Sequence, residues 1–317
     1  MFLESFKITG LAIFEIFLLG AIGYFLVKKN ILGAEGLNAL SRLVIEITLP
    51  VMIFVQLIKG FTFHLYPNWW IFPLISIAIT VIGLVIGKIF TVFIKGSQHK
   101  LQFLSLVAFQ NSGYLPLALT AALLPKAQQE PMFIYLFLFL LGFNLVIWSF
   151  GVYMLSFHQN KRFELGSLFS PPVIATILSL CFIFFGLNKF LPDFLLKPLG
   201  LIGDCTLPLA MFVVGGNLAE IRLKQVDIKA VALVTIIKLI LPLLGLVLMM
   251  KLKIDFLIGL LIMMQLAMPP ATSLSVILRH YKKEDLLISQ GIFFGHIISI
   301  LLIPIFLSLY FSVVMIK

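Results

Sequence analysis

Ten runs of predominantly apolar residues, each long enough to cross a lipid bilayer, occupy most of this 317-residue chain. A membrane-spanning helix needs roughly 20 such residues. The runs are 8–27, 38–58, 69–94, 101–124, 132–156, 171–190, 197–219, 228–250, 255–278 and 286–315. Their connections are short and leave no room for a soluble domain, and the runs lack the alternating pattern of a membrane β-barrel. The chain is therefore predicted to be an all-α integral membrane protein with ten transmembrane helices.

Composition excludes the other broad classes of protein. Hydrophobic residues make up 61% of the chain and charged residues only 11%, whereas a soluble domain carries roughly 25% charged residues. Disordered chains need few hydrophobic residues and many charged ones, so disorder is excluded as well. The net charge of +10 comes from basic residues scattered singly or in pairs, so no nucleic-acid partner is expected. Cys181 and Cys205 lie in apolar runs and are too far from a C-x-x-C spacing to suggest a disulfide framework or a metal site.

Lysine and arginine are biased toward one set of connections. The connections that follow odd-numbered runs hold twelve basic residues, whereas the even-numbered connections and the two termini hold eight. Positive charge favours the cytoplasmic side of a membrane. We therefore expect a multi-pass protein of the cell (plasma) membrane with both termini outside. The twelve residues are Lys28, Lys29, Lys95, Lys100, Lys161, Arg162, Arg222, Lys224, Lys229, Arg279, Lys282 and Lys283.

A short motif recurs at half the chain length. The second run contains Glu46-Ile-Thr-Leu-Pro-Val-Met-Ile-Phe54, and the seventh contains Asp204-Cys-Thr-Leu-Pro-Leu-Ala-Met-Phe212, 158 residues later. Five runs separate the copies, and an odd number inverts the second copy in the membrane, as in many secondary transporters. We therefore predict two inverted five-helix repeats, residues 1–157 and 158–317. Chance similarity between apolar segments is the alternative.

The fourth and ninth runs carry helix-breaking residues near their centres. Proline removes a backbone hydrogen bond, and glycine loosens the helix. Broken backbone at membrane depth is tolerated only where it is buried in protein or lines a water-filled cavity. The half-helix after each break presents its N-terminus, which favours an anion; a kinked packing helix is the alternative. The candidate substrate-binding residues are Asn111, Ser112, Gly113 and Pro116 in the fourth run, and Gln265, Pro269, Pro270, Thr272 and Ser273 in the ninth.

Ionisable side chains inside the runs are the candidates for coupling or gating, because burying each in a membrane costs roughly 2.5–3.5 kcal/mol. Pro50 and Pro208 each free the carbonyl four residues earlier, which belongs to Glu46 or Asp204. Each acid therefore offers a carboxylate and a free carbonyl, which suit Na+ or proton uptake; pairing with a neighbouring helix is the alternative. Lys238 needs an anionic partner, Glu46 or Asp204, or serves as the counter-charge of an anionic substrate.

His296, in the tenth run, completes this set and either relays a proton or bonds to a neighbouring carbonyl. The chain has neither the H-E-x-x-H motif of metalloproteases nor a Walker A sequence. No metal, no cofactor and no direct use of ATP are therefore expected. A membrane-embedded enzyme that uses Asp204 with Glu46 or His296 remains an alternative, as does a sensor that binds its ligand without moving it.

Several local sequences together resemble the auxin efflux carrier family and its bile acid/sodium symporter relatives. The resemblance implies that helices 4 and 9 are broken and cross each other. It also implies a scaffold of helices 1, 2, 6 and 7 and a moving transport core of helices 3–5 and 8–10. The similar segments are Leu49-Pro50, Asn111-Ser112-Gly113-Tyr114 with Pro116-Leu117, Ser170-Pro171, Leu207-Pro208-Leu209-Ala210 with Gly215-Gly216-Asn217-Leu218, and Pro304.

The same resemblance implies a secondary active transporter, not an enzyme, that moves a small organic anion by alternating access and is coupled to H+ or Na+. The compact chain is similar to bacterial-type permeases for malate or malonate. A sodium-coupled symporter of the bile acid type is the alternative. The expected partners are the organic anion, the coupling ion, the lipid bilayer and a second copy of the chain in a homodimer.

Overall fold

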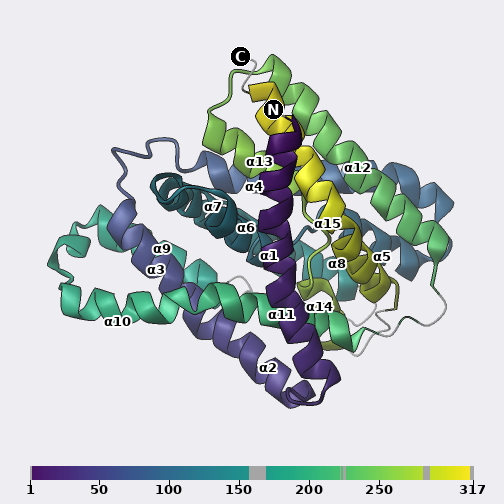
Figure 1. The fold of residues 1–317 in the computed structure, drawn as a ribbon, viewed down its shortest axis with the longest axis horizontal. Coiled ribbons are helices and arrows are strands. Elements are labelled where there is room, and N and C mark those ends of the chain that lie inside the picture. Colours follow the sequence, from purple (N-terminus) through teal and green to yellow (C-terminus); the bar gives the residue numbers. More distant parts are fainter. Residues whose placement is uncertain (1, 157–168, 222, 224–225, 281–285, 315–317) are drawn as a thin grey trace.

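The computed structural model describes residues 2–156, 169–221, 223, 226–280 and 286–314. These residues form helices joined by short connections, and no strand occurs among them. Figure 1 shows the arrangement. The elements are α1 (Phe2–Lys28), α2 (Ala34–Leu43), η1 (Val44–Thr48), α3 (Leu49–Gly60), α4 (Ile71–Phe90), η2 (Thr91–Phe93), α5 (Ser97–Ala108), α6 (Tyr114–Leu123), α7 (Lys126–Val146), η3 (Ile147–Gly151), α8 (Val152–Ser156), α9 (Pro171–Phe184), η5 (Leu187–Phe190), α10 (Asp193–Asp204), α11 (Thr206–Glu220), α12 (Ile228–Lys251), α13 (Phe256–Ala267), α14 (Ser273–His280) and α15 (Leu286–Val314).

The all-α membrane fold predicted from the apolar runs is confirmed, but the count of ten crossings is not. In the described part of the chain, seven helical segments are long and apolar enough to span a bilayer. They are Phe2–Lys28, Ala34–Gly60, Ile71–Phe93, Lys126–Ser156, Asp193–Glu220, Ile228–Lys251 and Leu286–Val313. The other three runs contain shorter helices, because two are interrupted and the third ends early.

The run predicted at 171–190 is the one that ends early. Its helix α9 stops at Phe184, and Gly186 follows with a φ of 70° in the left-handed region. Glycine adopts this conformation without a side-chain clash, and it is a frequent helix stop. A 3-10 turn, η5, replaces the last predicted turn. Hydropathy missed this stop because Leu187 and Phe190 extend the apolar run past Gly186, although Asn188 and Lys189 lie between them.

The two copies of the acid-Thr-Leu-Pro motif lie at irregular points of otherwise long helical segments. In the first copy, π-helix η1 contains Glu46 and precedes Pro50, which lies in the first turn of α3. In the second copy, α10 ends at Asp204, and α11 begins at Thr206 with Pro208 in its first turn. Proline cannot donate the next helical hydrogen bond, and a π-turn or a chain bend accommodates the loss. The motif therefore marks a local distortion in both places.

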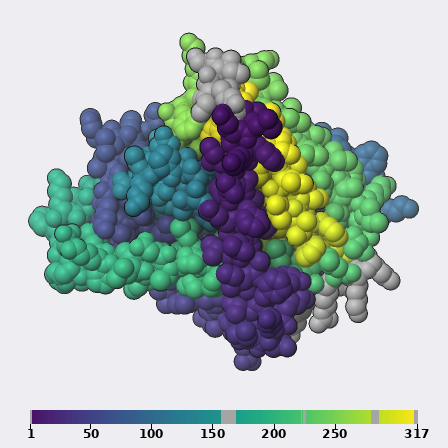
Figure 2. Space-filling view, in the orientation of Figure 1, coloured from purple at the N-terminus to yellow at the C-terminus, as the bar shows by residue number. Residues whose placement is uncertain are grey.

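Helix α1 crosses one face of the molecule and packs between α11 and α15 (Figure 2). Its contact with α11 is close because both helices present glycine. A Cβ atom on Gly23 would overlap the backbone of Phe212, and one on Gly215 would overlap the carbonyl of Gly20. Membrane helices commonly associate through such small residues, since van der Waals packing replaces the hydrophobic effect inside lipid. The N-terminal end of α1 and the C-terminal end of α15 lie at the same end of the molecule (Figure 1).

The remaining helices fall into two groups by their contacts. In one, α3 packs on α9 and α10, and η1 contacts α2, α9 and α11. In the other, α4 packs on α5 and α7, and α12 packs on α13 and α15. Contacts of α1 with α6 and α15, and of α7 with α3 and α9, join the groups. The helical interruptions lie where the groups meet.

Candidate functional site

The interruptions predicted in the fourth and ninth runs are both present, and they contact each other. Residues 109–113 separate α5 from α6, and residues 268–272 separate α13 from α14. The Asn111 N–H donates to the Pro269 carbonyl at 2.8 Å, and the Ala271 N–H donates to the Phe109 carbonyl at 2.9 Å. Gln110 and Pro270 form an isolated antiparallel bridge between these two bonds. The two extended segments thus satisfy part of each other's exposed backbone deep in the protein. We call this pair of segments, 109–113 and 268–272, the crossing.

Local sequence explains where each helix stops. Pro269 and Pro270 lack the N–H groups that would continue α13. Gln265 Nε2 donates to the Ser112 carbonyl at 3.2 Å and so ties the two breaks together with a side chain. Gly295 on α15 makes room for the break, because a Cβ there would lie 2.6 Å from Pro270 Cδ. Pro116 lies in the first turn of α6, where a helix needs no N–H donor, so it follows the break and does not interrupt α6.

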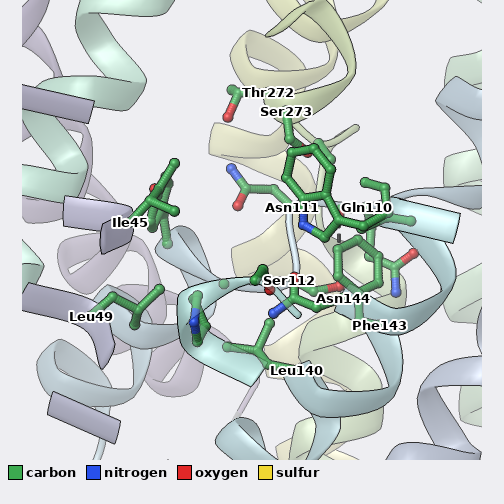
Figure 3. Close-up of a pocket in the computed structure, with 17 residues that line it drawn as sticks. Ile45, Leu49, Gln110, Asn111, Ser112, Leu140, Phe143, Asn144, Thr272 and Ser273 are labelled. Carbon is green, nitrogen blue, oxygen red and sulfur yellow. Dashed lines mark hydrogen bonds between the residues drawn. The ribbon is translucent and has the colours of Figure 1, made fainter. Parts of the chain in front are cut away.

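A cavity of about 120 Å³ lies beside the crossing. At roughly 30 Å³ per water molecule it has room for about four, a volume that suits a small organic acid. Figure 3 shows Ile45 and Leu49 on one side of it and Asn111, Ser112 and Thr272 on the other. Its walls are Ile45, Leu49, Gln110, Asn111, Ser112, Gly113, Tyr114, Leu140, Phe143, Asn144, Ile147, Trp148, Ser170, Pro172, Ala271, Thr272 and Ser273.

The cavity is polar at the crossing, and none of the described residues in its wall is charged. Both half-helices begin there: α6 starts at Tyr114 and α14 at Ser273. Each helix N-terminus carries free N–H groups and a partial positive charge. Two buried side-chain atoms of wall residues, Gln110 Nε2 and Ser170 Oγ, have no hydrogen-bond partner within the described part of the chain. A buried polar group without a partner costs about 1–3 kcal/mol, so these two donors are suited to an acceptor that enters the cavity.

His296 lies behind the crossing on α15 and is fully buried. Its Nδ1 is 2.8 Å from the Ile292 carbonyl, and its Nε2 is 3.4 Å from Asn111 Nδ2. Because a carbonyl oxygen only accepts, the proton resides on Nδ1, and Nε2 accepts from the Asn111 amide. Of the two interpretations of His296 from sequence, this geometry matches the bond to a carbonyl. The imidazole therefore also fixes the orientation of an amide that lines the cavity.

The ionisable residues predicted to partner Lys238 do not do so. Glu46 is exposed and pairs with Arg42, one helical turn earlier, at 3.0 Å. Asp204 is exposed at the end of α10. Lys238 is 8% exposed on α12 and forms no ion pair in the described part of the chain. Helix α12 packs on α13, α15, α5 and α4, whereas η1, which carries Glu46, packs in the other group. None of the three side chains lines the cavity.

The predicted binding residues divide into cavity walls and supports. Asn111, Ser112, Gly113, Thr272 and Ser273 line the cavity. Gln265, Pro269 and Pro270 hold the crossing together from behind it, and Pro116 lies in α6 outside the wall. The sequence-based set omitted twelve of the wall residues named above, and half of these are polar or aromatic: Gln110, Tyr114, Phe143, Asn144, Trp148 and Ser170.

Some of these omitted residues carried a sequence signal. Gln110 precedes the predicted break directly, and Asn144 lies at the centre of the fifth run beside Gly142. Trp148 gave no such signal, because it lies in a π-helical turn, η3, that hydropathy does not indicate. Among the described residues, no three His, Cys, Asp or Glu side chains gather as a metal site would require. Six of the basic residues used for orientation, Lys161, Arg162, Arg222, Lys224, Lys282 and Lys283, lie outside the described residues.

Comparison with known proteins agrees with this architecture. The family model for membrane transport proteins matches residues 10–165 and 157–307. A PIN-LIKES protein of Arabidopsis thaliana is 31% identical over 124 residues, which are 38% of this chain and 29% of that protein. An uncharacterized transporter of Methanocaldococcus jannaschii is 28% identical over 225 residues, which cover 66% of this chain and 68% of that protein. The chain therefore belongs to the membrane transport protein family of the auxin efflux carriers, and it is a membrane transporter, not an enzyme.

Proposed function

We propose that the protein is a secondary active transporter that moves a small organic anion, such as a carboxylate, by alternating access. The observation that carries this assignment is the cavity at the crossing of the two breaks. Its wall combines two helix N-termini with the unpartnered donors Gln110 Nε2 and Ser170 Oγ. A carboxylate accepts hydrogen bonds through both oxygens and carries the charge that helix N-termini favour. The volume of about 120 Å³ favours a small acid over a bulky amphipathic one.

Alternating access needs two bodies that move past the bound solute, and the cavity lies between two groups of helices. Ile45, Leu49, Ser170 and Pro172 line it from η1, α3 and the start of α9. The remaining wall comes from the two breaks and from α7 and η3. We assign the first group, with α1, α10 and α11, to the scaffold and the second to the transport core. A rocking motion of one group against the other would open the cavity to either side of the membrane.

This mechanism accounts for the internal repeat. Residues 1–157 and 158–317 form inverted five-helix repeats, and the interrupted helical pairs α5–α6 and α13–α14 each count as one crossing of the ten. An even number of crossings puts both termini on one side, the outside of the plasma membrane by the basic-residue bias. The ends of α1 and α15 that lie together in Figure 1 support this topology. A homodimer would pair the scaffolds and leave the transport cores free to move.

The driving ion is H+ or Na+, and Glu46, Asp204 and Lys238 are the candidates for coupling or gating. Lys238 is the most constrained of them, since a buried cation without an ion pair in the described residues is costly inside a membrane. Proton uptake by a group near Lys238, or an anion bound near it, would change the free-energy cost of burying the Lys238 charge. A symporter of the bile acid type would instead use Na+, and the two couplings differ in the gradient that drives uptake.

Uptake by purified protein in proteoliposomes tests the assignment. Malate, malonate and indole acetate would be offered with and without pH and sodium gradients. We expect saturable uptake of a small carboxylate that one of the two gradients accelerates. Indole acetate moving in preference to the smaller acids would contradict the size argument. If no carboxylate moves under any gradient, the transported class is wrong.

Two substitutions of His296 separate a positioning role from a proton-carrying role. His296→Leu removes the acceptor of the Asn111 amide, so we expect carboxylate uptake to fall by about three- to tenfold, the value of one neutral hydrogen bond. His296→Gln supplies an amide oxygen in place of Nε2 and should keep most of the uptake and its response to a pH gradient. If His296→Gln loses the response to a pH gradient but keeps exchange of the anion, His296 carries the coupling proton instead.

A further inference from the structure

A second cavity shares no wall residue with the cavity at the crossing. It is a groove of about 830 Å³ between the last turns of α4, the first half of α5, and the η3–α8 segment. We name it the α4–α5–α8 groove. Leu84, Val85, Leu101 and Leu104 form its apolar body, and Lys88 and Lys100 are the charged residues that line it in the described part of the chain. Its volume suits a chain-like apolar group much better than a small ion.

The described residues of the groove carry charge of one sign. Lys88 and Lys100 are exposed, and neither forms an ion pair within the described residues. No Asp or Glu among these residues lines the groove. A third basic residue, Lys229, lies near the same end of α4, with its Nζ 5.8 Å from the centre of the Phe93 ring. A ligand of the groove must therefore carry negative charge where it meets the two lysines.

The apolar part of the groove opens toward lipid. Val85, Ile89 and Phe150 line it and are 58%, 63% and 44% exposed, as expected for residues that face hydrocarbon. They belong to the long apolar segments that span the membrane. Lysines at the end of a membrane helix sit at the level of the headgroups, where they attract anionic lipids. The groove thus joins an apolar channel at bilayer depth to a cationic rim at the headgroup level.

We propose that the α4–α5–α8 groove binds a phospholipid with a net negative headgroup, whose phosphate meets Lys88 and Lys100 and whose acyl chain lies along the apolar body. Three features support this occupant over the transported anion. Among the described residues, the crossing cavity has no lysine in its wall and shares no wall residue with the groove, and exposed apolar side chains of membrane-length helices line the groove. Because α5 leads from Lys100 into the break that follows Ala108, the lipid would also brace one half of the interrupted helix.

Lipid binding to the purified protein, measured by native mass spectrometry, tests the site. Phosphatidylglycerol would be compared with phosphatidylcholine and with glycerol 3-phosphate, which has the phosphate but no acyl chain. We expect phosphatidylglycerol to bind in preference to both. Lys88→Gln with Lys100→Gln should weaken it by about 30-fold, because each basic residue near a membrane surface contributes roughly fivefold.

A matched variant and a second groove variant complete the test. Lys28→Gln with Lys29→Gln removes two exposed lysines from the end of α1 and should leave the preference unchanged. Val85→Trp fills the groove without removing charge and should weaken phosphatidylglycerol about fivefold or more. Equal binding to wild type and to the Lys88/Lys100 variant would overturn the site. Glycerol 3-phosphate binding as tightly as the lipid would also overturn it. A loss of dimer in the groove variants would overturn it as well, because it would indicate a second copy of the chain as the occupant.

Discussion

Replacing Gly215 with alanine should lower the free energy of unfolding by roughly 3 kcal/mol, the upper range for overpacking a well-packed contact. Helices α1 and α11 touch at this point, and a new Cβ would overlap the Gly20 carbonyl. The neighbour is backbone, so it cannot move aside as a flexible side chain would. The helices would have to separate, and the contact between α1 and α11 would be lost. Thermal unfolding of the purified variant in detergent, followed by circular dichroism, measures the effect.

Gly10→Ala on α1 is the matched control. No heavy atom lies within 4 Å of a Cβ built at Gly10. Alanine favours a helix over glycine by about 1 kcal/mol, so this variant should unfold at the wild-type temperature or slightly above it. A Gly215→Ala protein that unfolds together with wild type would show that α1 and α11 are not in backbone contact.

Asn111→Ala should reduce kcat/KM for uptake of a small carboxylate by about 10- to 150-fold, the value of one hydrogen bond to a charged group. The side chain lines the cavity and is held by His296. The backbone bond from Asn111 N–H to the Pro269 carbonyl does not involve the side chain, so the crossing should survive the substitution. The measurement is initial uptake into proteoliposomes at several substrate concentrations, at matched protein orientation and amount.

Asn188→Ala provides the control for this loss. Asn188 lies in η5, outside the cavity wall, so its removal should leave uptake within about twofold of wild type. Equal uptake by wild type and Asn111→Ala would contradict the placement of the anion at the crossing. Equal loss in both variants would point to a general defect of the protein and not to the site.

The exposure and packing of the predicted ionisable partners show where sequence reasoning failed. Glu46, Asp204 and Lys238 were grouped because each is a charge in an apolar run. In a soluble helix an apolar stripe identifies the buried face. The runs here are apolar on all sides, so no stripe shows that Lys238 is buried while Glu46 and Asp204 are exposed. Glu46 follows Arg42 by four residues, which is the spacing of an i, i+4 pair on a helix, and this is the ion pair that forms.

Residue pattern alone was enough to predict that the chain is helical, lies in a membrane and is interrupted near Gly113 and near Pro269-Pro270. Hydrocarbon forces every backbone group into local hydrogen bonds, and proline and glycine prevent those bonds at particular residues, so both properties are local. Helix packing, by contrast, brings the interruptions together, places Gln110 and Ser170 with them around one cavity, and sets His296 against Asn111. These are contacts between residues far apart in the chain, and they depend on which helix faces pack together. An apolar surface that is uniform around each helix does not encode that choice.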